Sequence, residues 1–455
     1  MRMLGAIWGQ SVPHWNRQLK IIDNKIANDM IKKALILTFL TIMFCSNLFA
    51  QKDKYPSKEQ EEYYKNLNRE FVRFKPLDTV FILGFKPEYY EIHEENLNYE
   101  PYSPDKYLTP YQDSIYQIRD SIHKKIRSIV APIYQNSKEL PDSISNVVKG
   151  LYESMFSQIE YIGKVEKYNI LKYEKKDNIE AFIYTDYEYE ALFYGGGPGI
   201  WIAYSENSGK DWKYYYTGIV QMQPVFVKHY SQRPLIKDKN KLEIDACLFR
   251  QLSEFSHPIG ADFECVKDGI YLVFDINVIA KDSDGDGLTD ILEDKLYLDK
   301  YNKDTDRDGI SDNLDMNPRV HYPRTEETGI YEAILNDKID WKNKKGIGKL
   351  LFNENMTYNV TDSTETVFII TNNKDLMGIQ PLKYRVIFIT PDEYQNKAKP
   401  YNMNPRSMSF SPLFKVDKKK NTYKIFHSFG TGGVDYLIRK TKKGWTIEII
   451  SMWIS

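Results

Sequence analysis

The strongest constraint on this chain is a pair of acidic segments built to one pattern. The first covers residues 282–293 and the second, which starts 22 residues later, covers residues 304–315. In each segment Asp occupies the first, third, fifth and ninth positions, and Gly at the sixth position is followed by an apolar residue. Alternate carboxylates around a Gly that permits a sharp turn converge on one centre, and calcium prefers about six to eight hard oxygen ligands. The spacing therefore predicts two calcium-binding loops.

The loop pattern assigns a role to each ligand position. Three alternating carboxylates begin the loop, a backbone carbonyl follows the Gly, the ninth residue binds directly or through water, and the twelfth closes the shell. The predicted ligands of the first loop are Asp282, Asp284, Asp286, Leu288, Asp290 and Glu293. The predicted ligands of the second loop are Asp304, Asp306, Asp308, Ile310, Asp312 and Asp315. Because Asp315 is shorter than the usual Glu, the second loop is predicted to be the weaker site.

Two other interpretations of the segment were weighed. An acidic, solvated linker would explain the composition but not the repeated Gly and apolar positions. Calcium could instead serve only to rigidify a connector between domains. Residues 282–315 hold twelve acidic and four basic side chains, which repel one another without an ion. This structural role for calcium is the one that we favour.

The same residues resemble the bacterial form of the thrombospondin type 3 repeat. The resemblance rests on residues 282–290, the apolar turn at 291–298, the second loop at 304–312, and Asn317-Pro318 as terminator. It implies EF-hand-like calcium loops that join modules of secreted or surface proteins. It covers under a tenth of the chain, and the Leu-Asp-Lys-Tyr turn that begins at residue 298 departs from the family's Gly-Thr-Asp-Pro-like turn. That departure concerns the geometry between the loops rather than the ligands.

The N-terminal region contains an export signal that begins at an internal methionine. A basic start at Met30 leads into an apolar run over residues 34–44, and Ala50 offers a small residue at the cleavage point. The run is too short for a good membrane span. An uncleaved anchor and a lipid-modified Cys45 are the alternatives. The pattern predicts export to the periplasm, the cell surface or the medium, with no transmembrane helix in the mature chain.

The rest of the first half predicts helices followed by antiparallel strands. Apolar residues at three- and four-residue spacing predict a helix over residues 115–130 that ends at Pro132, and a second helix starts at Asp142. An apolar run at 80–85 predicts a strand. Period-two patterns rich in aromatic and β-branched residues then predict strands at 159–173, 181–184, 188–194, 200–204, 212–220, 225–230, 242–249 and 270–278.

The C-terminal region begins with a predicted helix at residue 326 and continues mainly as strands. A short helix is predicted at 391–395, with Thr390 as its cap. Strands are predicted at 365–371, 384–390, 424–428, 435–441 and 445–454.

The predicted fold class is therefore α+β with several domains. Its parts are a miscalled upstream segment (1–29), a signal peptide (30–50), a helix-plus-antiparallel-β domain (51–280), a calcium-repeat linker (281–320) and a smaller C-terminal α+β domain (321–455).

Outside the acidic loops the chemical signals are weaker. Cys247 and Cys265 lie in strand-like stretches, where a disulfide across adjacent strands and two buried thiols are equally good interpretations.

Residues 205–212 form an Asp-box-like motif, with Asn207 in place of the usual Asp, and predict a structural hairpin. Paired catalytic carboxylates cannot be identified from the sequence, and neither a Gly-x-Ser-x-Gly elbow nor a zinc-binding histidine spacing occurs.

Charge and motif content together favour binding over catalysis. The formal net charge is −1, which does not suggest nucleic-acid binding. We expect an exported calcium-binding protein that acts as a non-catalytic surface or secreted interaction module, with an unidentified protein or glycan partner. The alternative is a secreted hydrolase, possibly glycan-active, with its site in the β-rich region.

Overall fold

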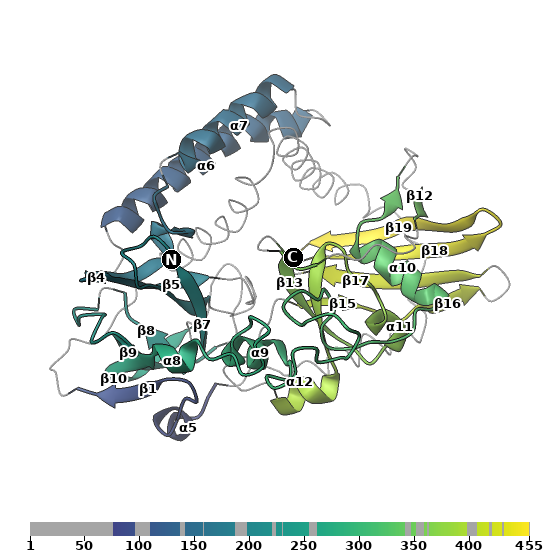
Figure 1. Ribbon diagram of the computed structural model, residues 1–455. Coiled ribbons are helices and arrows are strands. Elements are labelled where there is room, and N and C mark those ends of the chain that lie inside the picture. The colour runs from purple at the N-terminus through teal and green to yellow at the C-terminus, as the bar shows by residue number, and fades with distance from the viewer. Residues whose placement is uncertain are drawn as a thin grey trace. The chain divides into compact units, whose positions relative to one another are not determined.

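The computed structural model describes two compact units, which meet in the sequence at Ala280 and Lys281 (Figure 1). The described residues are 76–95, 110–136, 142–157, 159–186, 198–220, 224–229, 231–253, 262–341, 347–351, 359–361, 364–397, 407–417, 421–429 and 432–454. The predicted upstream segment, the signal peptide and the strand at 188–194 lie outside these residues. Contacts group the acidic segment with the C-terminal strands, since the second unit begins at Lys281.

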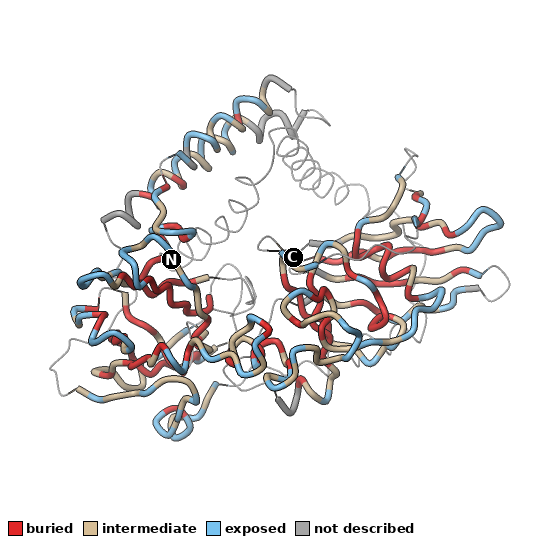
Figure 2. The backbone as a smooth tube through the Cα atoms, in the orientation of Figure 1, coloured by how far each residue is buried: buried red, intermediate tan, exposed pale blue. Residues whose placement is uncertain are grey.

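The first unit contains two four-stranded antiparallel sheets. One has the order β4–β5–β6–β7 and the other the order β1–β10–β9–β8. Buried residues run along both faces of the central strands β5 and β6 (Figure 2). The strands are β1 (Glu91–Glu94), β4 (Ile170–Lys176), β5 (Ile179–Asp186), β6 (Gly199–Ser205), β7 (Lys213–Val220), β8 (Val225–Val227), β9 (Lys241–Gln251) and β10 (Phe263–Asp275), with a separate ribbon of β2 (Tyr161–Ile162) and β3 (Val165–Glu166).

Two long helices lie between β1 and the remaining strands of this unit in the sequence. The helices are α6 (Pro110–Asn136) and α7 (Asp142–Phe156), so the predicted start at Asp142 is confirmed. The helix predicted over 115–130 is also confirmed, but it continues through Pro132 instead of ending there. Arg119 of α6 donates to Glu166 at 3.1 Å between two buried side chains, which ties this helix to β3.

Three predicted strands in the first unit are wrong in part or whole. The apolar run at 80–85 contains helix α5 (Thr79–Leu83), because Asp78 caps it by accepting a hydrogen bond from the Val80 amide at 2.6 Å. The predicted strand 159–173 is interrupted by a turn and by the 3₁₀ helix η2 (Lys167–Asn169). The end of the predicted strand 270–278 forms α8 (Ile276–Ile279), capped by Asp275.

The second unit is built on a nine-stranded mixed sheet. Its order is β11–β12–β19–β18–β17–β15–β13–β14, and β16 pairs with β17. The pairs β13–β14 and β13–β15 are parallel, whereas the other pairs are antiparallel. The strands are β11 (Ile339–Asp340), β12 (Ile347–Leu350), β13 (Glu365–Ile370), β14 (Tyr384–Ile389), β15 (Ser407–Phe410), β16 (Phe414–Asp417), β17 (Thr422–Phe429), β18 (Gly432–Thr441) and β19 (Gly444–Ile454).

Short helices accompany this sheet. They are α9 (Asp290–Leu296), α10 (Glu326–Leu335), α11 (Lys374–Met377) and α12 (Pro391–Lys397). Helix α10 lies against the sheet, and its Tyr331 and Ile334 join Ile425 and Ile438 in the core of this unit (Figure 1). The predicted helices at 326 and 391 are confirmed.

The predicted α+β class is wrong, because the described part of the chain is mostly β-sheet. Of the described residues, 41% are in strands and 22% in helices, and the sheets are several and largely antiparallel. The helical periodicity of residues 115–155 is strong, but it covers only two elements. The helices of the second unit have four to ten residues and cap or connect strands instead of forming a layer of comparable weight.

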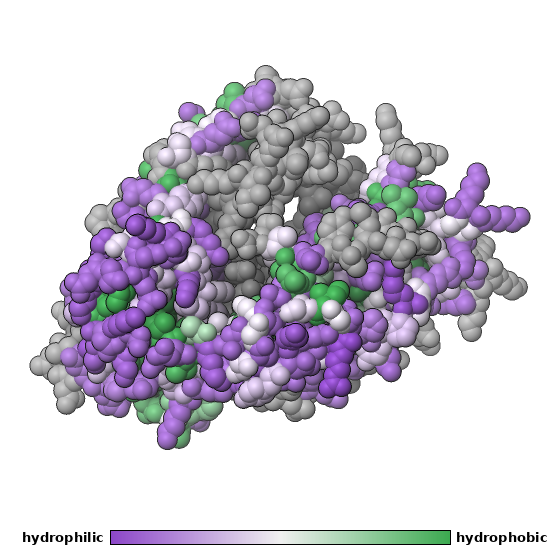
Figure 3. Space-filling view, in the orientation of Figure 1, coloured by the Kyte–Doolittle hydropathy of each residue, from purple (hydrophilic) through white to green (hydrophobic). Residues whose placement is uncertain are grey.

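Polar and apolar surfaces are distributed as expected for these cores. On the face shown in Figure 3, hydrophilic side chains predominate over the described surface and the apolar areas are small and separate. Within the described part of the chain, no helix combines the length and the apolar character needed to cross a membrane. Cys247 on β9 and Cys265 on β10 are free thiols in this structure, the first buried and the second partly exposed.

Candidate metal centre

The two acidic loops have the same backbone turn. The fourth position has a positive φ in both loops, 78° at Gly285 and 64° at Arg307. The sixth position also does, 101° at Gly287 and 97° at Gly309. Only Gly adopts the latter values without strain, which explains the invariable Gly at that position of the pattern. The predicted equivalence of the two loops therefore extends to backbone conformation.

Backbone amides hold the first three carboxylates of each loop in place. Asp282 accepts from the amides of Gly285 and Gly287 at 2.7 and 3.0 Å, and Asp286 accepts from Leu288 at 2.7 Å. In the second loop, Asp304 accepts from Asp308 and Gly309 at 3.2 and 2.9 Å, and Asp308 accepts from Ile310 at 2.8 Å. Each loop is thus wrapped around its own acidic side chains.

The ninth residue fastens each loop to its beginning. Both oxygens of Asp290 accept from Ser283, at 2.8 Å from its amide and 2.8 Å from its hydroxyl. Asp312 accepts in the same way from Thr305, at 2.9 and 2.7 Å. The Nζ of Lys281 also donates to Asp290 at 2.9 Å. These contacts make the ninth residue a clasp for the loop.

Three carboxylates converge in the first loop. Ligand atoms of Asp282, Asp284 and Asp286 lie within 4.8 Å of one another. Oδ2 of Asp284 is buried and has no hydrogen-bond partner. The three side chains therefore meet as the spacing predicts, with one oxygen left for a further interaction.

Glu293 occupies the closing position of the first loop and is the most informative side chain of the site. It is fully buried, at 0% exposure, and neither carboxylate oxygen has a hydrogen-bond partner. Its amide donates to the Thr289 carbonyl at 2.9 Å, which places Glu293 in the first turn of α9. A buried carboxylate is costly unless it is paired or coordinates a metal. Two orphaned oxygens at the closing position fit a bidentate calcium ligand.

The pKa of Glu293 agrees with a buried carboxyl group that has no compensating partner. Burial raises its pKa to about 8, and the nearby charges of Asp284 and Asp286 act in the same direction. By contrast, the hydrogen bonds from Lys281 and Ser283 lower the pKa of Asp290 although burial opposes them. Lys281 and Ser283 thus stabilise the charged form of Asp290, whereas no neighbour stabilises the charged form of Glu293.

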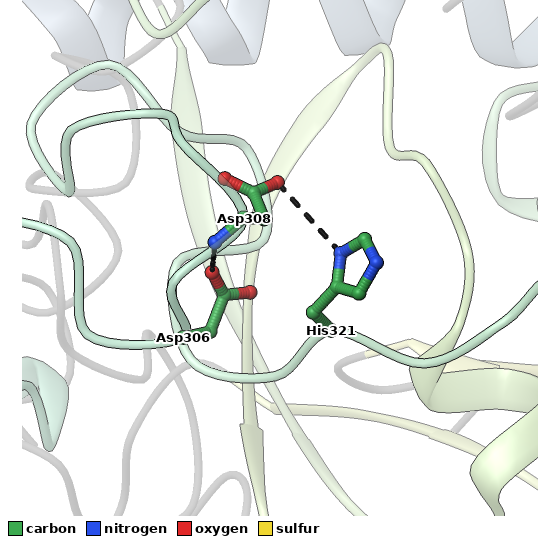
Figure 4. Close-up of side chains that lie close together, drawn as sticks. All are labelled: Asp306, Asp308 and His321. Carbon is green, nitrogen blue, oxygen red and sulfur yellow. Dashed lines mark hydrogen bonds and ion pairs between the residues drawn. The ribbon is translucent and has the colours of Figure 1, made fainter.

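The second loop combines carboxylates with a histidine. Ligand atoms of Asp306, Asp308 and His321 lie within 4.8 Å of one another (Figure 4). The Nδ1 atom of His321 faces Oδ2 of Asp308 at 4.0 Å. Below them, Asp315 is 6% exposed and its Oδ2 has no partner, while its other oxygen accepts from the Asn317 amide at 2.8 Å.

The acidic side chains of the second loop also repel one another. Burial raises the pKa of Asp315 to about 7, and the charges of Asp308 and Asp306 add to this effect. Burial likewise raises the pKa of Asp306 to about 6, with the charge of Asp308 as the next cause. A cation bound among these groups would reverse the effect, since it favours their charged forms.

The loops are joined to each other and to the large sheet. The Asn313 amide donates to Oδ2 of Asp286 at 3.1 Å, so the second loop supports a ligand of the first. Buried Arg385 of β14 donates to the Asp312 carbonyl at 2.7 Å, and the Val386 amide donates to the Met316 carbonyl at 2.7 Å. The second loop is therefore anchored along strand β14.

Two contributors to the site have no signal in the spacing of the loops. His321 lies six residues beyond the closing Asp315, and Asn313 contributes to the loop that precedes its own. No rule of spacing indicates either residue, because both contacts depend on how the segment folds back on itself. Asn317 was noted only as a terminator, but its side chain also donates to the Val320 and Met377 carbonyls, at 3.1 Å in both cases.

The β region of the first unit offers a different kind of acidic group. Glu243 and Asp245 lie on the same side of β9, and each is 6% exposed. Arg233 donates to both, at 3.3 Å in each case, and Ser231 donates to Asp245 at 2.8 Å. Lys237 pairs with Glu243 as well. The carboxylates are therefore neutralised by cations, as in a structural ion-pair network.

The Asp-box-like motif forms the predicted hairpin between β6 and β7. Ser205 Oγ accepts from the Gly209 amide at 3.0 Å, and Asn207 Oδ1 accepts from the Asp211 amide at 2.9 Å. Trp212 packs beside Phe182, with 4.9 Å between ring centroids. These contacts hold the turn between two paired strands, so the predicted structural hairpin is confirmed.

Comparisons with protein-family models, with curated proteins and with solved structures give no match to this chain.

Proposed function

We propose that this chain is an exported calcium-binding protein whose acidic segment is ordered by the ion. The observation that carries the proposal is Glu293, which is fully buried with both oxygens unpartnered at the position that closes a calcium loop. The repeated Asp and Gly positions supply the rest of the shell. The first loop is the stronger calcium site and the second the weaker one.

The ion has a structural role in this proposal. Residues 281–320 follow directly on α8 of the first unit and are anchored to β14 of the second. Calcium would neutralise the carboxylates that otherwise repel one another, and so would rigidify the connector between the two units. The chain as a whole would then act as a non-catalytic surface or secreted interaction module, as the resemblance to thrombospondin type 3 repeats implies.

Calorimetry on the full chain tests calcium binding. The metal-stripped protein should bind calcium and its melting temperature should rise, because a ligand that binds only the folded state stabilises it. Both effects should disappear when Asp284→Ala and Asp306→Ala are combined. If the double variant binds calcium and melts as the parent does, these loops are not calcium sites.

A hydrolysis screen tests the non-catalytic part of the proposal. Any turnover of glycan or peptide substrates by the parent protein should persist when a single carboxylate is replaced. The matched pair of variants is Glu243→Gln and Asp245→Asn, since these are grouped carboxylates of the β region. Turnover lost in either variant would replace the proposal with that of a secreted hydrolase.

A further inference from the structure

The second loop differs from the first in the kind of donor atoms that it brings together. In the first loop the converging donors are carboxylate oxygens from Asp282, Asp284 and Asp286. In the second loop an imidazole joins Asp306 and Asp308, because residues after Asn317-Pro318 carry His321 back over the loop (Figure 4). The difference lies outside the repeated pattern, so it is a property of this chain and not of the loop design.

The distance between His321 and Asp308 fits a shared cation. At 4.0 Å, Nδ1 and Oδ2 are too far apart for a hydrogen bond. A divalent ion bonds nitrogen or oxygen at about 2.0–2.3 Å, so two ligands of one ion lie about 3–4.3 Å apart. The side chain of His321 is 65% exposed, so it can make the small movement toward Asp308 that ligation of a shared ion requires.

Asp315 is an independent indication that a cation binds at this place. It is 94% buried, one of its oxygens has no partner, and the charges of Asp306 and Asp308 act on it. A side chain of this type is stable in the folded protein when a cation completes its interactions. Asp315 is thus buried at the closing position of the second loop, while His321 is exposed beside Asp308.

The donor set favours a particular class of ion. Imidazole suits transition metals, whereas carboxylate and carbonyl oxygens suit magnesium, calcium and manganese. Asp315 uses one oxygen for the Asn317 amide, so it offers one oxygen to an ion where Glu293 offers two. A shell with one nitrogen and fewer oxygens matches a six-coordinate ion smaller than calcium.

We propose that the second loop and His321 form a mixed oxygen–nitrogen site for a divalent transition cation of the manganese class. Its ligands are Asp304, Asp306, Asp308, the Ile310 carbonyl, Asp315 and His321. This inference deepens the proposed function, since it makes the second loop, the weaker of the two calcium sites, one that prefers manganese. It rests on the acidic loops being metal sites.

Pulsed electron paramagnetic resonance of the full chain with Mn²⁺ tests the proposal. Calcium sufficient to fill the first loop, as fixed by calorimetry, is present throughout. We expect Mn²⁺ bound to the parent protein to show ¹⁴N modulation from a coordinated imidazole. The modulation should be lost in His321→Ala, and Mn²⁺ affinity should fall about tenfold or more, since even an outer partner of a ligand contributes that much.

His93→Ala is the matched control for adventitious binding. His93 is also exposed and lies beside a carboxylate, 2.7 Å from Glu91. This variant should keep both the modulation and the affinity of the parent. Absence of ¹⁴N modulation in the parent, or its retention in His321→Ala, would overturn the manganese site.

The outcome for calcium is separate. Calcium binding that is lost in Glu293→Gln but unchanged in His321→Ala supports the assignment of different ions to the two loops. If the parent binds no calcium, the proposed function fails, whatever the resonance experiment gives. Manganese bound without nitrogen, together with normal calcium binding, would overturn this inference alone.

Discussion

The two acidic loops share a frame but differ in how their ligand shells close. Both have the positive-φ fourth and sixth positions and the clasp from the ninth residue to the second. The first loop closes with Glu293, which has two unpartnered oxygens, and the second closes with Asp315, which has one. The repeated residues therefore build the turn, and the residues at its closing end determine which ion it suits.

Substitution of the closing residues should give the largest difference between the loops. We expect Glu293→Gln to weaken calcium binding about a hundredfold and Asp315→Asn to weaken it about tenfold or less, since the first removes a bidentate ligand and the second a single oxygen. Calorimetric titration of the full chain measures both. Equal losses of calcium affinity in the two variants would show that the two closing residues are equivalent.

A conservative pair of clasp variants serves as the control. Ser283→Ala and Thr305→Ala remove one hydroxyl bond to Asp290 and to Asp312, respectively. Each should cost about 1 kcal/mol in the free energy of unfolding, with similar values for the two loops. Calcium affinity should change much less than in the Glu293 variant.

The metal-free protein should lose stability as pH rises from about 4 to about 8. Carboxylates of an unfolded chain titrate near pH 4, whereas the folded protein holds the pKa of Asp315 at about 7 and that of Glu293 at about 8. Between these limits the folded state binds more protons than the unfolded state, so the free energy of unfolding decreases with pH. Above pH 8 this contribution is constant.

Denaturant melts with a chelator, at a series of pH values, measure this slope. Glu293→Gln should reduce the slope of stability against pH more than Asp315→Asn does, because Glu293 has the higher pKa of the two residues. Excess calcium should abolish the slope in the parent protein. A slope unaffected by Glu293→Gln would show that this residue is not the buried charge that we describe.

Much of the site could be predicted because a calcium loop is local in sequence. Asp282, Asp284 and Asp286 converge through turns of a few residues, and Glu293 follows within one helical turn, so spacing determines their positions. His321 and Asn313 could not be predicted in this way. Their contacts arise from the path of the chain after each loop, which depends on packing against strand β14.

The fold was predictable strand by strand but not in its class. The C-terminal strands predicted at 365–371 and 384–390 are present, yet their parallel pairing as β13 and β14 has no signature in either segment. The helix α5 replaced a predicted strand because one cap, Asp78, outweighed a short apolar run. Long helices in the first unit suggest a larger helical share than the described residues have.

The sixth-position glycines provide a smaller test of the shared frame. Gly287→Ala and Gly309→Ala should each lower the free energy of unfolding by about 1–2 kcal/mol, because an L residue is strained at positive φ. Gly287→Ala should cost more, since its Cβ would lie 3.2 Å from the Asn313 side chain, whereas the Cβ at Gly309 meets open space. Chemical denaturation of the metal-free protein measures the difference. Equal costs would indicate that Asn313 moves aside freely.

The fourth position should give the smallest effect and one of opposite sign. Arg307 occupies the left-handed conformation that Gly285 adopts in the first loop. Arg307→Gly removes about 1–2 kcal/mol of strain but adds about 0.5–1 kcal/mol of unfolded-state entropy, so a net gain of about 0.5–1 kcal/mol is expected. Gly285→Arg should cost a similar amount. Arg307→Gln controls for the lost charge, because it removes the charge and keeps the strained conformation. A gain in the Gly variant but not in the Gln variant assigns the effect to strain. A loss in both variants would show that the charge of Arg307 among the carboxylates matters more than its backbone.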